Sequence, residues 1–261
     1  MIRLPGILPA TFSLLAWGHP PKPVHPRPRP FRIMLDPGHG GQDQGAHGPR
    51  GLLEKRAALE IALDVGARLK AAGFRVDYTR DNDTFIPLWD RAKKANKDGD
   101  DLFISLHLNA ARARSARGSE VYFLSLGQGD NDELAAEENA SAGAKPASGS
   151  DGVVASILDD LAQQAYLQDS ERLAVDIQNA LNRLAGIKER GVKQAPFIVL
   201  RGAAMPAVLV EAAFISNPRE ERKLRNPRFV DRVADAIVQG IRRYIAAGNG
   251  TVRRRAIEGP R

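Results

Sequence analysis

Three of the five histidines in this 261-residue chain stand where a folded structure can hold them for chemistry: His39, His47 and His107. The other two, His19 and His25, lie in a proline-rich segment near the start. His39 follows a short apolar run, in the glycine-rich stretch DPGHGG, whose glycines allow a sharp turn and a close approach. His107 ends a second apolar run. Because ligands of α/β sheets bind beyond the carboxyl ends of strands, we expect His39 and His107 to converge.

Two glutamates can complete a site with these histidines. Glu54 opens a predicted helix, where the helix dipole also favours an acidic side chain without any catalytic role. Glu211 directly follows the apolar run 207–210 and precedes further apolar residues. A charge in such surroundings needs a partner, a metal ion or a reaction. A buried ion pair is the structural alternative for Glu211.

Two histidines, one carboxylate and a second, free carboxylate form a complete hydrolytic set. Zn²⁺ accepts imidazole nitrogen and carboxylate oxygen, leaves one position for water and lowers the pKa of that water, whose proton a free glutamate can take. The same 2-His-1-carboxylate set also suits Fe(II) in oxygenases, which do not need a buried base there. The sequence contains no H-E-x-x-H, G-x-S-x-G or P-loop pattern, and the absence of cysteine excludes thiolate ligands and cysteine nucleophiles.

The elements that must position these residues alternate along the chain. The predicted strands are residues 31–35, 74–79, 102–106, 121–124, 197–200 and 207–210, and the predicted helices are residues 54–72, 88–96, 171–184 and 227–246. Strands that alternate with helices predict an α/β layered domain.

The composition divides the chain into three parts. Residues 1–30 are a broken apolar run and a proline-rich basic linker, with a signal peptide or a tail as alternatives; residues 31–247 form one folded domain, and residues 248–261 are a basic tail. The net charge of +7 favours anionic partners, but it is the only feature that suggests nucleic acid, so we expect no nucleic-acid partner. No apolar stretch is long enough for a membrane span.

Residues 127–169 interrupt the alternation of strands and helices. The segment is rich in Ala, Gly, Ser, Asp and Glu, and insertions of this length inside a compact domain are usually functional or disordered. Within it, residues 133–140 can form a short acidic helix. Residues 153–167 carry apolar side chains at helical spacing, which predicts that this part packs on something.

Five ordered motifs resemble one family, the zinc-dependent N-acetylmuramoyl-L-alanine amidases of bacterial cell-wall turnover. They are DPGHGG at 36–41, EK at 54–55, SLHLNA at 105–110, RGVKQAPFIVL at 190–200 and VEAAFISNP at 210–218. The resemblance spans roughly residues 31–245, nearly all of the chain that is predicted to fold. It implies a three-layer α/β fold with a central, mostly parallel sheet flanked by helices.

The resemblance also implies the chemistry. One Zn²⁺ is expected on His39, Glu54 and His107, with Glu211 as the catalytic glutamate. The expected reaction is hydrolysis of the amide between N-acetylmuramic acid and the L-alanine of the stem peptide in peptidoglycan. Such an enzyme acts in the periplasm or is otherwise exported, and we expect a monomer. The alternative is a non-catalytic peptidoglycan-binding or regulatory protein on the same scaffold.

The insertion resembles the regulatory segment of the division-associated amidases. In those relatives a helix covers the active site and one of its glutamates caps the zinc. Glu138 is the candidate for that role here, with Glu137 as the second choice. A carboxylate in the water position would block catalysis until an activator displaces the helix, and the resemblance implies an activator with a LytM-type domain. A flexible surface loop is the alternative for this segment.

Overall fold

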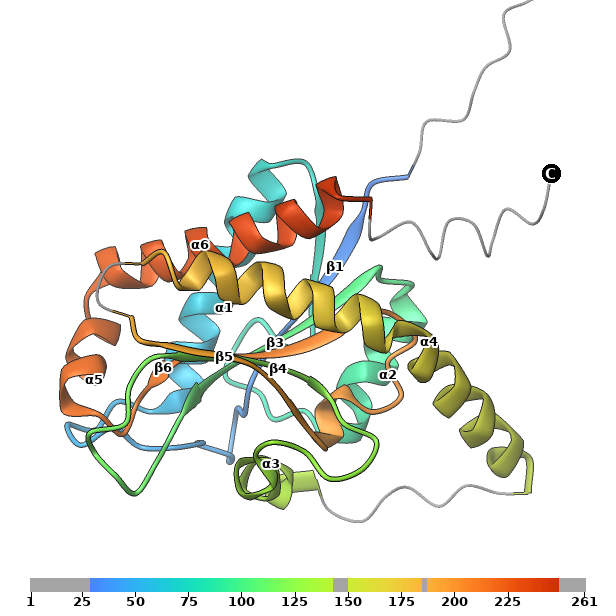
Figure 1. Cartoon of the computed structure of the whole chain (residues 1–261), viewed down its shortest axis with the longest axis horizontal. Coiled ribbons are helices and arrows are strands. Elements are labelled where there is room, and N and C mark those ends of the chain that lie inside the picture. The colour runs from blue at the N-terminus through green and yellow to red at the C-terminus, as the bar shows by residue number, and fades with distance from the viewer. Residues whose placement is uncertain (1–28, 143–149, 185–186, 249–261) are drawn as a thin grey trace, which may run out of the picture.

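The computed structural model describes residues 29–142, 150–184 and 187–248, and over 150–163 it describes the backbone alone. Its centre is a six-stranded sheet in the order β2-β1-β3-β6-β4-β5 (Figure 1). The strands are β1 Arg32–Pro37, β2 Arg75–Tyr78, β3 Leu102–Asn109, β4 Ser119–Leu124, β5 Glu189–Ala195 and β6 Ala207–Phe214. All neighbours pair in parallel except β4 and β6. The predicted α/β class with a mostly parallel sheet is confirmed.

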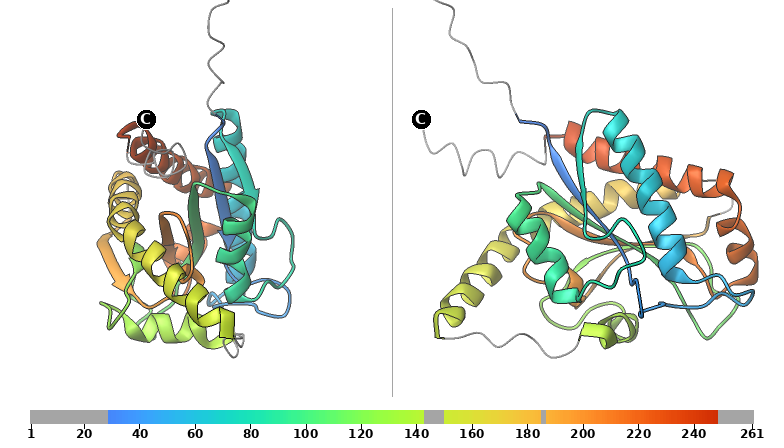
Figure 2. Two further views of the ribbon diagram at one scale, coloured as in Figure 1. Left: turned by 90° about the vertical axis from the view of Figure 1, so that its right-hand side faces the viewer. Right: turned by 180° about the vertical axis from the view of Figure 1, so that it is seen from behind.

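Helices cover both faces of the sheet. One buried cluster joins the sheet to α1 Glu54–Ala71, α4 Ser150–Leu181 and α6 Pro227–Ala246, and a second joins its other face to α2 Leu88–Asp98, α3 Asp132–Asn139 and the short 3₁₀ helix η2 Ile198–Leu200. Figure 1 shows α4 and α6 side by side on one side of the sheet and α3 on the other, and Figure 2 shows the layers from two further directions. The chain is therefore a three-layer α/β domain.

The amphipathic pattern of α6 explains how one of these layers forms. Its predicted apolar stripe is buried against the sheet and α4, at positions Val230, Val233, Ile237, Ile241 and Tyr244. The side chain of Asn226 accepts a hydrogen bond from the backbone N–H of Arg228, and Pro227 occupies the first helical turn. This is the cap predicted from the Asn-Pro pair. Among the described residues, no helix is long and apolar enough to cross a membrane.

One predicted strand was wrong, and one strand of the sheet was not predicted. The apolar run 197–200 is not a strand, and Ile198–Leu200 form the 3₁₀ helix η2, which packs into the second cluster. An apolar run indicates only that its side chains are buried, and the side chains of a short helical turn can be buried as well as those of a strand. The strand next to β4 is instead β5, whose sequence ERGVKQA is polar because only one of its seven residues is fully buried. The helix predicted at 171–184 is the second half of α4, which begins at Ser150 without a break.

Further differences concern the ends of elements and the insertion. β3 and β6 extend beyond the predicted ends, so His107 and Glu211 lie inside strands rather than after them. The short helix α5, Pro218–Leu224, was not predicted, although Asn217 caps it. The acidic helix predicted at 133–140 is confirmed as α3. The apolar face predicted for 153–167 falls mostly on side chains outside the described residues, and Ala165, which is described, is exposed.

Candidate metal centre

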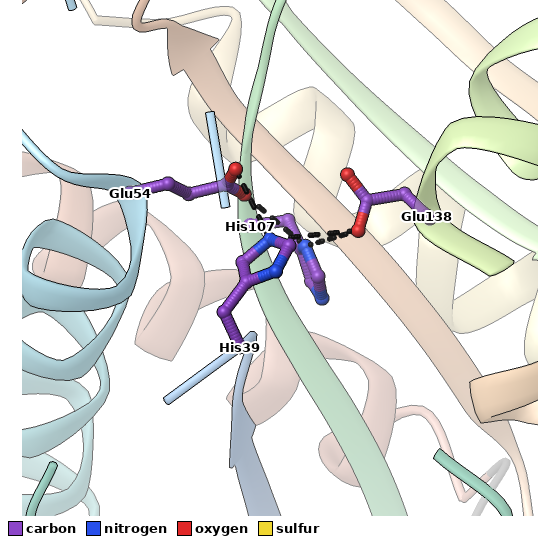
Figure 3. Close-up of side chains that lie close together, drawn as sticks. All are labelled: His39, Glu54, His107 and Glu138. Atoms are coloured by element: carbon purple, nitrogen blue, oxygen red, sulfur yellow. Dashed lines mark hydrogen bonds and ion pairs between the residues drawn. The ribbon is translucent and has the colours of Figure 1, made fainter. Parts of the chain in front are cut away.

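Four side chains from four separate elements meet at one edge of the sheet (Figure 3). His39 follows β1, Glu54 is the first residue of α1, His107 lies in β3 and Glu138 lies on α3. One nitrogen or oxygen atom from each of them lies within 4.8 Å of the others. All four were predicted from the sequence, His39, Glu54 and His107 as ligands and Glu138 as the cap.

The nitrogens and oxygens of this cluster point toward one another. His39 Nε2 lies 3.1 Å from Glu54 Oε2, and His107 Nδ1 lies 3.2 Å from Glu54 Oε1. Glu138 Oε2 lies 3.1 Å from His107 Nδ1 and 3.5 Å from His39 Nε2. Although His39 Nε2 is buried, it makes no hydrogen bond to another described residue. A buried nitrogen that faces two carboxylates without hydrogen bonding is suited to metal ligation.

The glycine loop places the histidines by leaving no room for a side chain. A Cβ atom on Gly38 would lie 2.4 Å from Cε1 of His107. A Cβ on Gly45 would lie 2.6 Å from Cδ2 of His39, and Gly45 also has a φ of +64°. His39 itself has a φ of 59°, the left-handed region that side chains rarely adopt. The loop therefore holds a strained backbone that aims the His39 ring at the cluster.

A set of hydrogen bonds fixes the orientation of each candidate ligand. Asp43 Oδ1 lies 3.1 Å from Nδ1 of His39, the ring nitrogen that faces away from Glu54. The carboxylate of Glu54 accepts backbone N–H groups from Ala46 and Leu108, both at 2.9 Å. Such partners hold metal ligands in place and select the histidine tautomer.

Two arginines hold the backbone of the loop at Gly38 and His39 by hydrogen bonds, and neither arginine was predicted from the sequence. Arg91 and Asp36 form an ion pair at 3.0 Å, and both side chains are fully buried. The guanidinium of Arg91 also donates to the carbonyl oxygen of His39 at 2.9 Å. Arg80 donates to the carbonyl oxygen of Gly38 at 2.6 Å. No local pattern marks these arginines, because the oxygens that they contact, on Asp36, Gly38 and His39, are distant in sequence.

The electrostatics of the cluster favour positive charge on the histidines. Burial alone would lower the pKa of His39, but the Glu54 carboxylate and the bond to Asp43 raise it to about 10. The pKa of His107 is also raised despite burial, by Glu138 and Glu54. Burial would raise the pKa of Glu54, yet the two histidines hold it well below its usual range. Glu54 is therefore ionised, and its negative charge in this buried site attracts a cation.

Glu211 lies beside this cluster without belonging to it. On β6 it pairs in register with His107 of β3, and on its other side with Glu120 of β4. Its side chain is fully buried, and neither carboxylate oxygen has a hydrogen-bond partner among the described residues. Burial raises the pKa of Glu211, an effect that His107 opposes and that Glu138 strengthens. The predicted base is therefore a buried acid next to the candidate ligands.

The remaining predicted residues lie around a cavity of about 510 Å³ next to the cluster. The loop 42–47 forms one wall and α3 forms the other. His47 lines the cavity but does not join the cluster. Glu137 also lines it and is exposed, so the structure places Glu138, and not Glu137, at the histidines.

The donor set fits a divalent metal ion. Two imidazoles and two carboxylates suit Zn²⁺, and they also suit Fe(II). The buried Nε2 of His39, which faces the oxygens of Glu54 and Glu138, is consistent with either ion. The geometry thus supports a metal site without identifying the metal.

Known proteins are similar to this chain in sequence and fold. The profile of the Amidase_3 family, described as N-acetylmuramoyl-L-alanine amidase, matches residues 33–243. The amidase AmiC of Neisseria meningitidis is 42% identical over 219 residues, which are 82% of this chain and 52% of that protein. AmiC of Escherichia coli is 40% identical over 234 residues, 87% of this chain and 56% of that protein. The chain therefore spans about half the length of these two relatives.

A solved structure shows the same architecture. The N-acetylmuramoyl-L-alanine amidase from Clostridium difficile 630 superposes with a TM-score of 0.65 at 29% sequence identity. The match covers 84% of this chain and 98% of that one. The family profile at residues 33–243 spans the four cluster residues and Glu211.

Proposed function

Because the chain belongs to the Amidase_3 family of N-acetylmuramoyl-L-alanine amidases, we propose that it hydrolyses peptidoglycan at the amide between N-acetylmuramic acid and L-alanine. The observation that carries this proposal is the cluster of His39, Glu54 and His107 with the buried Glu211 next to it. A metal site and a free carboxyl group are together what amide hydrolysis needs.

In this proposal, three residues bind the metal ion and Glu211 transfers the proton. His39, Glu54 and His107 would hold the metal ion, which we propose to be zinc. When bound there, Zn²⁺ supplies Lewis-acid activation of water and polarises the scissile carbonyl group. Glu211 accepts a proton from the attacking water at its carboxylate and passes that proton to the nitrogen of the departing alanine amine. A buried carboxyl group with a raised pKa is suited to hold and release a proton.

We further propose that α3 inhibits the enzyme by placing Glu138 on the metal site. Glu138 approaches both histidines, while Leu134 and Ala135 anchor the helix in the core. At the end of the helix, the side chain of Asn139 donates to Pro196 O at 3.0 Å and accepts from the N–H of Ile198 at 2.7 Å. These contacts support a seated helix that occupies the position required by water and substrate.

Release of α3 would require a partner, for which a LytM-domain activator is the proposed class. The proposed setting is cell-wall turnover and separation of daughter cells, in the periplasm or otherwise outside the cytoplasm. These proposals follow from the likeness to division-associated amidases and not from a contact in the structure.

A metal measurement and a digest test the proposal together. Purified protein should contain zinc, and His107→Ala should lose it; iron as the bound metal would favour the oxygenase alternative. The zinc-loaded protein carrying Glu138→Ala, which lacks the proposed cap, should release peptides that begin with a free L-alanine amine from purified peptidoglycan. A folded, zinc-loaded protein with Glu138→Ala that releases none would instead support a non-catalytic wall protein.

A further inference from the structure

A row of ionisable side chains crosses one face of the sheet next to the metal cluster. His107 on β3 pairs in register with Glu211 on β6, which pairs with Glu120 on β4. Partners in register point to the same face of a sheet. The row continues on β5. Arg190 lies where the register of β4 and β5 shifts beside Glu120, and Lys193 pairs with Tyr122, which is two residues from Glu120 and so on the same face. The row therefore runs from a candidate ligand, through the proposed base, to two cations.

Glu120 holds those two cations in place. It is fully buried, and it accepts a hydrogen bond from Nε of Arg190 and lies 3.2 Å from Nζ of Lys193. Tyr122 donates its hydroxyl to the same carboxylate, and Asn109 donates its amide at 3.3 Å. Burial would raise the pKa of Glu120, but the bonds from Tyr122 and Arg190 lower it, so Glu120 is ionised. The cationic groups are fixed rather than free to move with solvent.

The two cations exceed the charge of the carboxylate that holds them. Their side chains are 31% and 24% exposed, so a ligand can reach them. Arg190 uses Nε toward Glu120, and its two Nη groups make no hydrogen bond or ion pair with another described residue. The guanidinium fork matches a carboxylate in a bidentate geometry, and an adjacent ammonium adds a second charge. Arg190 and Lys193 can therefore bind an anion together.

The reaction direction indicates which part of the substrate lies there. Glu211 returns its proton to the alanine nitrogen, so the peptide leaves on the side of Glu211. Beyond Glu211 the row continues to Glu120 and the two cations. A peptide carries carboxylates, whereas the N-acetylated glycan on the other side of the scissile bond offers mainly neutral groups.

We infer that Arg190 and Lys193 bind a carboxylate on the peptide side of the scissile amide, and that Glu120 is the positioning residue for this pair. The inference rests on the proposed function, because the substrate is the one proposed there. It assigns to the β4–β5 edge a role in substrate specificity that is separate from metal binding.

Two substrates that differ only in charge test the inference. One is N-acetylmuramoyl-L-alanyl-D-glutamic acid, and the other carries carboxamides in place of both carboxyl groups. Binding by calorimetry and hydrolysis are measured with the zinc-supplemented full chain carrying Glu138→Ala. Arg190→Gln and Lys193→Gln should each weaken binding and raise KM for the acid by about tenfold or more, the effect of a hydrogen bond to a charged group. Lys188→Gln and Arg201→Gln remove exposed cations elsewhere and should change neither value.

The carboxamide substrate separates recognition from folding. Arg190→Gln and Lys193→Gln should change its KM and kcat much less than they change KM for the acid, and Glu120→Gln should raise KM chiefly for the acid, with Glu120→Asp restoring part of the loss. Equal losses on both substrates would overturn the inference, because they indicate a structural or general catalytic role. Hydrolysis of both substrates without preference refutes the inference but not the amidase. Arginine-dependent binding of the acid without hydrolysis refutes the amidase but not the inference.

Discussion

Gly38→Ala tests whether the loop after β1 positions His107 by close contact. The added Cβ would lie 2.4, 2.5 and 2.7 Å from Cε1, Nε2 and Nδ1 of the His107 ring. Ordinary carbon contacts need about 3.5 Å, so the ring or the loop must move by roughly 1 Å. Neither moves freely, because Gly38 N donates to Leu106 O at 2.9 Å and the Gly38 carbonyl is held by Arg80.

The expected cost follows from that overlap. Forcing a methyl group into a packed interior costs about 1–3 kcal/mol of folding free energy. A displacement of about 1 Å at a catalytic group lowers a rate by roughly a hundredfold. We therefore expect Gly38→Ala to fold with reduced stability, to bind zinc at least about tenfold more weakly and to lose most amidase activity.

Chelator competition, thermal unfolding and peptide release measure these three effects. Gly127→Ala is the matched control, because a Cβ there meets nothing within 4 Å. A Gly38→Ala protein with the zinc affinity and stability of the control would refute the reasoning, since it would show that the His107 ring has room to spare.

Three further variants test the buried ion pair, the proposed cap and a buried carboxyl group. Arg91→Leu leaves Asp36 buried without its cation and should cost about 3–5 kcal/mol in denaturant unfolding. Glu138→Ala should raise basal peptide release, whereas Glu137→Ala, at an exposed position, should not. Equal effects of the two substitutions would contradict the role of Glu138 as the cap. Burial, and then the charge of a neighbouring carboxylate, raise the pKa of Asp100 to about 7, so the folded state binds the extra proton and loses stability as pH rises from 4 to 7. Asp100→Asn should therefore be more stable than the parent at pH 8, and a flat difference between pH 4 and 8 would contradict this.

The sequence was most informative where chemistry and position agreed. Elimination among five histidines and the apolar run before Glu211 selected the residues that the structure brings to one sheet edge. The glycine loop was also predictable, because glycines that follow an apolar run allow a sharp turn and a close approach. Glu138 came from resemblance alone, since an acidic helix by itself does not indicate what it faces.

The remaining features depend on tertiary contacts that have no local pattern. β5 is polar because it is an edge strand, and η2 is apolar because it is buried without being a strand. Arg91 and Glu120 act on residues from distant parts of the chain. The burial of Arg91 and Glu120 can be predicted only when the positions of the neighbouring strands and helices are known.

The most direct test of the central claim is peptide release from purified peptidoglycan by two zinc-loaded full-length proteins, Glu138→Ala and the double variant Glu138→Ala/Glu211→Ala. We expect free L-alanine amines from the first protein and none from the second, with equal zinc content and equal folding in both. Undiminished release by the double variant would contradict the role of Glu211 and, with it, the proposed reaction at this site.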